Sequence, residues 1–368
     1  MKTMWMILFL VLPFLGMVYV GWHLWLLLPL GGWWKAAIIL LGVACCLSLF
    51  LDISGRLNAM PLSLAKVLYN IGTSSIIVLL YAVMLFLVVD VASLVRLVPR
   101  EWVVNSLGGT LSCLGLLLAV FAYGFFNYKH KVRVPIDITT EKTLPRDYRI
   151  VMLTDLHLGY HNTRAELARW IDIVNDENPD VVLIAGDIID ISVRPLIEEG
   201  SAAEFHRLKA PVYACLGNHE YYSGTPEAQQ FYKDARIHLL SDAATEIDNT
   251  ITVIGRDDRT NRRRKSVEAL MAAADKEKFS ILLDHQPYDL ERSEKAGIDF
   301  QLSGHTHRGQ VWPISWVTDA MYECSWGEYF HGNTQYYVSS GIGIWGGRFR
   351  IGTQSEYVVA TLRSRKKR

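Results

Sequence analysis

The first 128 residues carry almost no charge, and this feature most restricts how the chain can fold. From Met1 to Tyr128 there are six Lys or Arg and three Asp or Glu, whereas the remaining 240 residues hold 31 and 34. Such a charge-poor stretch is typical of a membrane region, and the remainder has the composition of a soluble domain. This division excludes a purely soluble enzyme, a disordered chain and a disulfide scaffold.

Charged residues divide the first 128 residues into four uncharged apolar runs. A helix rises about 1.5 Å per residue, so the 23-residue run from Val67 to Val89 reaches about 34 Å and spans a hydrocarbon core about 30 Å thick. The shortest run, Ala36–Leu51, needs Trp33, Trp34 and a snorkelling Lys35 at its interfacial end. We predict a transmembrane domain over residues 1–128 with four helices, at about 4–30, 34–51, 67–89 and 102–126.

The basic residues that flank the four runs predict the orientation. Six Lys or Arg lie on the side of the N-terminus and three on the other side. Because Lys and Arg accumulate in cytoplasmic loops, we expect a multi-pass protein of the cell (inner) membrane with its C-terminal domain in the cytoplasm. Two ionisable residues lie within the runs, His23 and Asp90. Asp90 ends its run, and we interpret it as a residue solvated by interfacial water rather than as part of a proton relay.

Residues 129–148 are predicted to form a linker and a first strand, residues 149–362 the soluble domain, and residues 363–368 a basic tail. In the soluble domain, short β-branched runs alternate with helical patterns such as Arg164–Asn175 and Val267–Lys276. This alternation predicts an α/β fold with a largely parallel sheet. Five of the runs end in polar blocks, which we expect at one edge of the sheet: Asp155-Leu-His157, Gly186-Asp187-Ile-Ile-Asp190, Gly217-Asn218-His219-Glu220, His285 and Gly304-His305-Thr306-His307.

The polar blocks contain a complete set of metal ligands. They offer imidazole nitrogens and oxygens without thiolates, which suits Mn²⁺, Fe or Zn²⁺ better than a structural zinc site. Seven ligands exceed the needs of one ion, so we expect one carboxylate to bridge two ions about 3.5–4 Å apart. The candidate ligands are Asp155, His157, Asp187, Asn218, His285, His305 and His307.

In order and in placement at strand ends, these blocks resemble the five blocks of the calcineurin-like metallophosphoesterases, over roughly Arg149 to Leu362. The resemblance implies a four-layer αββα sandwich. Three finer features are similar to a membrane-associated branch of that superfamily, related to UDP-2,3-diacylglucosamine pyrophosphatases and to YkuE-type phosphoesterases. They are the stretch Ser303–Gln310, the stretch Val338–Gly343 and Arg350.

The resemblance also implies roles for individual residues. One divalent ion would be held by Asp155, His157, Asp187 and His307, and a second by Asp187, Asn218, His285 and His305. His219 would be catalytic, meeting the phosphoryl charge or protonating the leaving oxygen. Glu220 would be catalytic as well, by orienting the His219 ring. Alternatively, its carboxylate would cap the N-terminus of the following helix or face solvent. Asp190 is interpreted as a supporting or capping group.

For several other residues the sequence allows two roles each. Arg308, where the related branch usually has glycine, would grip a second phosphate or point to solvent. His161 would line the pocket or lie at the surface. The cluster of Arg259 and Arg262–Lys265 would bind a headgroup or form a solvated loop. The five cysteines are predicted to be free thiols, with Cys215 buried in a strand and Cys324 exposed.

Together these features predict a membrane-anchored phosphoesterase with two divalent metal ions, most simply Mn²⁺. A metal-bridged hydroxide would cleave a phosphoester or diphosphate bond, and tethering to the bilayer favours a lipid or nucleotide-lipid substrate. One alternative is a broad phosphodiesterase or phosphatase with a simple anchor, and a second is a catalytically dead regulatory or transport-associated protein. A nucleic-acid partner is not expected, because the chain lacks an excess of positive charge and a basic, aromatic groove.

Overall fold

The computed structural model describes residues 2–365, with side chains from residue 11 onward, and the chain forms two compact units. The first unit contains the N-terminal helices up to Phe125 together with Gly346–Arg348. The second contains Phe126–Trp345 and the chain from Phe349 onward. The boundary falls inside helix α5, so the last turn of that helix belongs to the second unit.

The first unit is helical. Three of its helical segments are long and apolar enough to cross a membrane, namely Gly32–Ile53, Leu62–Leu94 and Leu107–Lys129, and a shorter apolar segment covers Val11–Leu27. The three long segments correspond to the second, third and fourth predicted spans, whereas the count of four stays a prediction. The elements are α1 (Lys2–Leu27), α2 (Gly32–Leu47), α3 (Leu49–Ile53), η1 (Arg56–Ala59), α4 (Leu62–Leu94), η2 (Arg100–Trp102) and α5 (Leu107–Lys129).

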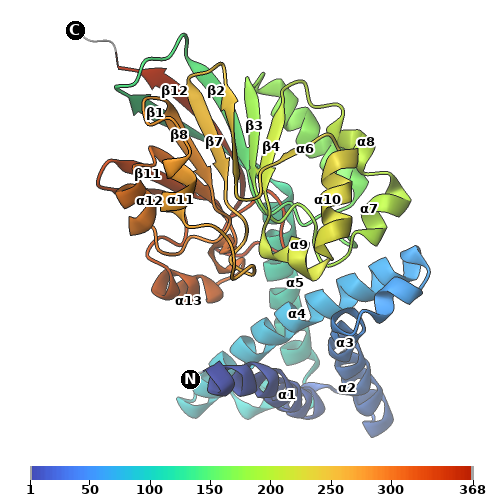
Figure 1. Ribbon diagram of the computed structural model, residues 1–368. Coiled ribbons are helices and arrows are strands. Elements are labelled where there is room, and N and C mark those ends of the chain that lie inside the picture. Colours follow the sequence, from blue (N-terminus) through green and yellow to red (C-terminus); the bar gives the residue numbers. More distant parts are fainter. Residues whose placement is uncertain (1, 366–368) are drawn as a thin grey trace. The chain divides into compact units, whose positions relative to one another are not determined.

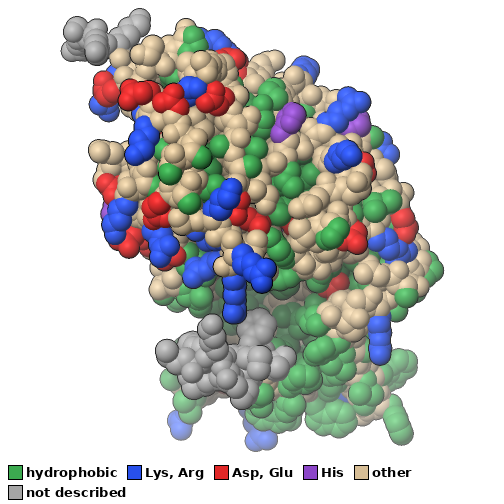
Figure 2. Space-filling model, in the orientation of Figure 1, with side chains coloured by type: hydrophobic (Ala, Val, Ile, Leu, Met, Phe, Trp, Pro, Cys, Tyr) green, Lys and Arg blue, Asp and Glu red, His purple; other side chains and the backbone are tan. Residues whose placement is uncertain are grey.

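Large apolar side chains are exposed along these helices, as the lower part of Figure 2 shows. Leu40, Leu41 and Val88 are 66–67% exposed. A soluble protein rarely exposes contiguous apolar surface of this kind, whereas helices with an apolar exterior are stable in hydrocarbon because their backbone groups are satisfied internally. The helices therefore indicate membrane association.

Two polar residues of this unit, Lys35 and Asp90, hydrogen-bond to other helical segments, and the Asp90 side chain remains 42% exposed. Lys35 is buried and donates hydrogen bonds to the carbonyl of Trp25 (2.7 Å) and to Oδ1 of Asn105 (2.8 Å), so the snorkelling interpretation is wrong. Asp90 accepts a hydrogen bond from the Tyr19 hydroxyl (2.5 Å) and lies 3.1 Å from Nε2 of His23. These contacts join α1 to α4, as polar side chains commonly do between apolar helices.

The second unit contains two six-stranded mixed sheets. In the first sheet β1 is parallel to β12, β12 is antiparallel to β2, and β2 to β5 are parallel. In spatial order this sheet is β1 (Lys131–Thr140), β12 (Ser355–Ser364), β2 (Tyr148–Leu153), β3 (Val181–Ala185), β4 (Val212–Cys215) and β5 (His238–Leu239). The second sheet is β10 (Gly327–His331), β11 (Thr334–Val338), β9 (Phe300–Ser303), β8 (Phe279–Leu283), β7 (Ile251–Gly255) and β6 (Ala243–Ile247).

Hydrophobic cores on both faces of the sheets arrange this unit in layers. One core is built from side chains of both sheets, including Ile150 and Phe300, so the sheets pack face to face. A second core lies between the first sheet and helices such as α6 (Arg164–Asp176) and α10 (Thr225–Asp234), and a third involves α11 (Val267–Ala272) on the other sheet (Figure 1). The remaining helices are α7 (Arg194–Glu199), α8 (Ala202–Phe205), α9 (Asn218–Tyr222), α12 (Glu291–Ala296), η3 (His307–Gly309) and α13 (Ile314–Met321).

The five predicted runs are all strands, but they do not share one sheet. The first three are β2, β3 and β4 of the first sheet, and the last two are β8 and β9 of the second. The expectation of a single sheet edge is therefore wrong, because the ligand loops come from two sheets packed on each other. At the other end of the domain, Arg363 and Arg365 of the predicted tail form ion pairs with Asp137 and Glu141, while residues 366–368 lie outside the described residues.

Candidate metal centre

The candidate ligands lie at strand ends where the backbone takes a left-handed conformation. Five of the seven have φ between 45° and 71°. This conformation is uncommon for residues other than glycine and costs about 1–3 kcal/mol where it occurs, so it persists only where surrounding contacts stabilise it. Such strain is frequent at functional sites. The five residues are Asp155, His157, Asp187, His305 and His307.

Two glycines permit the loops to approach one another. Gly186 has φ of 78°, and a Cβ atom there would lie 2.8 Å from Nδ1 of His285. A Cβ atom on Gly304 would lie 2.3 Å from Oδ2 of Asp155. A side chain at either position would therefore displace a candidate ligand, which explains why glycine precedes the polar residues in these blocks.

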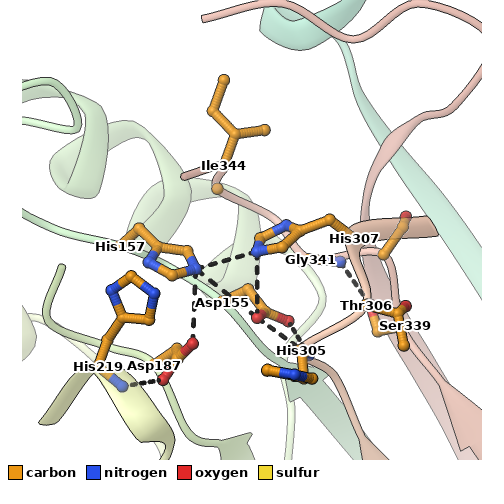
Figure 3. A network of polar contacts seen from close by, with 12 residues as sticks. Asp155, His157, Asp187, His219, His305, Thr306, His307, Ser339, Gly341 and Ile344 are labelled. Carbon is orange, nitrogen blue, oxygen red and sulfur yellow. Dashed lines mark hydrogen bonds and ion pairs between the residues drawn. The ribbon is translucent and has the colours of Figure 1, made fainter. Parts of the chain in front are cut away.

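One group of ligands joins the end of β2 to the loop after β9. Nε2 of His157 and Nε2 of His307 lie 3.0 Å apart, and Oδ1 of Asp155 lies 3.4 Å from the His307 nitrogen and 3.7 Å from the His157 nitrogen (Figure 3). Ring nitrogens and a carboxylate oxygen that converge in this way form a suitable pocket for a divalent cation.

A second group contains Asp187, which also lies close to His157 of the first group. Oδ2 of Asp187 lies 3.0 Å from Nε2 of His285 and 3.7 Å from Nε2 of His157, and His305 completes the group. Among the described residues, Oδ1 of Asn218 is buried without a hydrogen-bond partner. A buried polar atom without a partner is costly, so this oxygen fits a site that is completed by a bound cation.

The electrostatic balance of the pocket divides the four histidines into two pairs. Burial opposes protonation, but the carboxylates of Asp155 and Asp190 raise the pKa of His157 to about 10, and Asp187 likewise raises the pKa of His285. Burial and the neighbouring His285 lower the pKa of His305 to about 4, and burial and His157 lower that of His307. The pKa values of Asp155 and Asp187 are lowered because nearby imidazoles outweigh the effect of burial.

Glu220 and Asp190 support this centre in ways that the sequence did not distinguish. The Glu220 carboxylate accepts hydrogen bonds from the backbone N–H groups of Gly217 (2.7 Å), Asp187 (3.1 Å) and Ile189 (3.0 Å). It therefore fixes the Asp187 loop and caps α9, and the interpretation that it orients the His219 ring is wrong. Oδ1 of Asp190 lies 3.2 Å from Nδ1 of both His157 and His219, so Asp190 orients the two rings.

His219 lies beside the two ligand groups. Its backbone N–H donates to Oδ1 of Asp187 (2.9 Å), and its ring packs edge-on against that of His157 at 4.5 Å between centroids (Figure 3). Because Nδ1 faces Asp190, Nε2 is the ring atom that remains for another partner.

Arg350 is fully buried beneath the His307 loop. Nη1 donates to the carbonyl of His307 (2.8 Å) and Nη2 to that of Gly343 (3.0 Å). Burial lowers the pKa of the Arg350 guanidinium to about 10. No sequence pattern indicates this structural role, because Arg350 lies in an irregular segment and its backbone partners belong to other loops.

The sequence of the second unit matches known proteins. Residues 148–309 match the family described as calcineurin-like phosphoesterase. A metallophosphoesterase of Aquifex aeolicus is 30% identical over 247 residues, which cover 62% of this chain and 90% of the relative. The chain belongs to the calcineurin-like metallophosphoesterases. The resemblance inferred from the five blocks is thus confirmed.

Two further relatives of this chain extend well beyond the matched region. A metallophosphoesterase of Campylobacter jejuni is 34% identical over 230 residues, covering 61% of each chain. A transmembrane protein with metallophosphoesterase domain from Danio rerio is 30% identical over 269 residues, covering 67% of this chain and 61% of the relative. The chain therefore spans less than two thirds of the length of these two relatives.

The two predicted substrate-binding residues have different surroundings. The guanidinium of Arg308 lies over the Trp326 ring (4.4 Å to the centroid), with Nε 3.9 Å from Oδ1 of Asp319. His161 is fully buried, and its Nε2 lies 2.6 Å from the carbonyl of Ile344, so the surface reading of His161 is wrong. Contact of either residue with a substrate stays a prediction.

Two surface assignments also need correction. Arg264 is not part of a solvated loop: its Nη1 lies 2.9 Å from Oδ1 of Asp284, and Nη1 of Arg256 lies 2.9 Å from the other oxygen of the same buried carboxylate. Arg259 packs on the Tyr288 ring at 4.1 Å. Cys324 is buried rather than exposed, whereas Cys215 is buried in β4 as predicted, and all five cysteines are free.

The raised pKa values predict how metal affinity depends on pH. In the metal-free protein His157 holds a proton up to about pH 10, and a cation must displace that proton to use Nε2. Affinity is therefore expected to rise with pH, by roughly tenfold per pH unit for each displaced proton. Calorimetric titration with Mn²⁺ from pH 6.5 to 8.5, in buffers of different ionisation enthalpy, would measure the affinity and the number of protons released on binding. Affinity that does not change with pH would contradict the assignment of His157 as a ligand.

Proposed function

We propose that this protein is a membrane-associated, metal-dependent phosphoester hydrolase with two divalent ions. The observation that carries the proposal is that Asp187 belongs to two candidate ligand groups, one with His157 and the other with His285 and His305. Oδ1 of Asn218 is buried without a hydrogen-bond partner, which supports its assignment to the second ion. The donors are nitrogens and oxygens, which suit Mn²⁺, Fe or Zn²⁺, and Mn²⁺ is proposed as the working ion.

The residues of the chain have distinct tasks in this mechanism. When bound, the two cations lower the pKa of water and neutralise charge on the phosphoryl oxygens. Asp155, His157 and His307 would hold one ion, and Asn218, His285 and His305 the other, with Asp187 shared. His219, whose Nδ1 is held by Asp190, presents Nε2 to the substrate, where it donates a proton to the leaving oxygen or stabilises phosphoryl charge.

A phosphorylated amphiphile, either a phospholipid or a nucleotide-lipid, is proposed as the substrate. The support comes from chain connectivity: α5 ends at Lys129 and β1 begins at Lys131, so His130 alone separates an apolar helix from the first strand of the catalytic unit. A link this short restricts the unit to the neighbourhood of the bilayer. The alternative is a broad phosphodiesterase or phosphatase with a simple anchor, which would use the same metal ions and the same residues.

Turnover of a substrate panel tests the proposal. Full-length protein in detergent would be stripped of metal, supplied with Mn²⁺, Fe²⁺ or Zn²⁺, and given a nitrophenyl diester, a nitrophenyl monoester and UDP-diacylglucosamine in mixed micelles. We expect hydrolysis that requires metal and is faster with the micellar substrate than with the soluble esters. His238→Ala is a suitable control, because His238 is an exposed residue of β5 outside the ligand groups.

The outcomes separate the three readings. Metal-dependent hydrolysis of the soluble esters without preference for the micellar substrate would favour the broad phosphoesterase. Two bound metal ions without turnover of any substrate would favour a regulatory protein. Failure of the chain to bind divalent metal would overturn the proposal altogether.

A further inference from the structure

We propose that the last turn of α5, at the end of an apolar helix, positions the metal ligands His157 and His307 through Tyr128 and Asn127. The inference rests on the proposed function, because it assigns a task to these residues at the same metal centre. The turn belongs to the catalytic unit, although by sequence it ends an uncharged apolar run. Tyr128 is completely buried there.

The first connection runs from Tyr128 to the His157 loop. The Tyr128 hydroxyl donates to Oδ1 of Asn162 at 2.5 Å. Nδ2 of Asn162 lies within hydrogen-bond distance of the carbonyls of Leu156 (3.0 Å), His157 (3.1 Å) and Ile344 (3.0 Å). Asn162 is 1% exposed, so this chain of bonds is shielded from competing water.

The second connection runs from Asn127 to the His307 loop. Nδ2 of Asn127 donates to the carbonyls of Arg350 (2.9 Å) and Thr353 (2.8 Å). The Arg350 side chain in turn donates to the carbonyl of His307 (2.8 Å). Two successive residues of one helical turn therefore support the two loops that carry both imidazoles of the first ligand group.

Two neighbouring lysines keep the turn in place. Nζ of Lys131 donates to the Tyr128 carbonyl (2.7 Å) and lies 3.8 Å from the centroid of the Tyr128 ring. Lys129 forms an ion pair with Glu166 on α6, which is 5% exposed. The ring of Tyr128 is thus held independently of its hydroxyl, and removal of the hydroxyl alone leaves the packing in place.

The supported loops need such contacts because both ligands adopt strained backbone conformations. His157 has φ of 45° and His307 has φ of 48°. Hydrogen bonds to their carbonyls hold the rings so that the two Nε2 atoms face each other at 3.0 Å before a cation arrives. Loss of this preorganisation lowers affinity for the ion that these two residues bind, and leaves the other ion unaffected.

The experiment compares Tyr128→Phe and Asn127→Ala with the matched control Tyr148→Phe in the full-length protein. Tyr148 is also completely buried and donates its hydroxyl to Asp248 (2.8 Å), away from the metal centre. Mn²⁺ binding would be measured by calorimetry together with thermal unfolding. Because loss of a group that orients a ligand costs about 10–100-fold in metal affinity, we expect about 3–10-fold for Tyr128, one bond further away.

Four outcomes are informative. The proposal is supported if Tyr128→Phe weakens one of the two Mn²⁺ sites, while Tyr148→Phe lowers thermal stability to a similar extent and binds both ions as the wild type does. It is overturned if Tyr128→Phe and Asn127→Ala bind both ions with wild-type affinity. If Tyr128→Phe does not fold, the Mn²⁺ affinity of Asn127→Ala alone tests the proposal. A wild-type protein that binds no Mn²⁺ would instead contradict the proposed function.

Excess Mn²⁺ provides a further readout that a packing defect would not produce. In Tyr128→Phe, raising the Mn²⁺ concentration should restore kcat to the wild-type value with KM for the ester unchanged, because the defect concerns occupancy of one ion site. A lowered kcat that persists at saturating Mn²⁺ would contradict the assignment.

Discussion

Replacement of Asp187 with asparagine is expected to lower phosphoester hydrolysis by at least about 1,000-fold, which corresponds to about 4 kcal/mol of transition-state stabilisation. Asp187 is the one residue common to both proposed ion sites. Its Oδ1 accepts the N–H of His219 (2.9 Å) and its Oδ2 lies 3.0 Å from Nε2 of His285. An asparagine would keep its oxygen on the N–H group and turn its amide nitrogen, a donor, toward the cations.

The metal content of Asp187→Asn gives a second measurement. We expect the number of Mn²⁺ ions bound per chain to fall from two to one or fewer, because the remaining ligands of each site lose their shared carboxylate. Asp234→Asn, on the exposed end of α10, is the matched control and should retain full activity. An Asp187→Asn protein that kept more than a tenth of the wild-type turnover would show that the two ions do not share this residue.

Replacement of His219 with glutamine is expected to lower kcat by about 100–1,000-fold for substrates with a poor leaving group, the range typical of a lost general acid. The effect should be much smaller for a nitrophenyl ester, since nitrophenolate leaves without protonation. The geometry supports this expectation, because Asp190 occupies Nδ1 and leaves Nε2 toward the ligand groups. The ratio of kcat values for the two classes of leaving group is the quantity to measure.

His219 also lies within reach of His157 and Asp187 as a member of a possible ligand group. Metal content therefore distinguishes its two roles. If His219→Gln keeps two ions per chain and loses turnover, His219 acts on the substrate. If it loses an ion, His219 is a ligand and the proton-transfer role is refuted. His206→Gln, an exposed histidine bonded to the carbonyl of Asp234, controls for the substitution itself.

Much of the architecture could be predicted because it depends on local patterns. Uncharged runs predicted the helical segments Gly32–Ile53, Leu62–Leu94 and Leu107–Lys129, since hydropathy and length are properties of a single segment. Apolar runs predicted β2, β3, β4, β8 and β9 for the same reason. Whether these strands share a sheet depends on pairing across the chain, and here the expectation of one edge was wrong.

The candidate site shows the same division. Asp155, His157 and His307 lie together in one candidate ligand group and Asp187, His285 and His305 in another, while the assignment of the seven residues to two ions stays a prediction. Glu220 was misassigned because its position beside His219 in sequence does not reveal where its carboxylate points. Its partners are backbone N–H groups of two separate loops, and these meet only after the strands have paired.

Hydropathy and residue type alone were sufficient to predict the division into an apolar helical region and a metallophosphoesterase domain, as well as the chemical nature of the ligand set. Hydropathy and residue type act within a few neighbouring positions, so no folding is needed to read them. Only the folded structure shows the hydrogen bond from Tyr128 to Asn162. The same holds for the bond from Asn127 to the carbonyl of Arg350, 223 positions further along the chain. These partners meet only when the two sheets and the end of α5 pack together. A sequence pattern covers a few neighbouring residues, so it cannot predict contacts between residues so far apart in the chain.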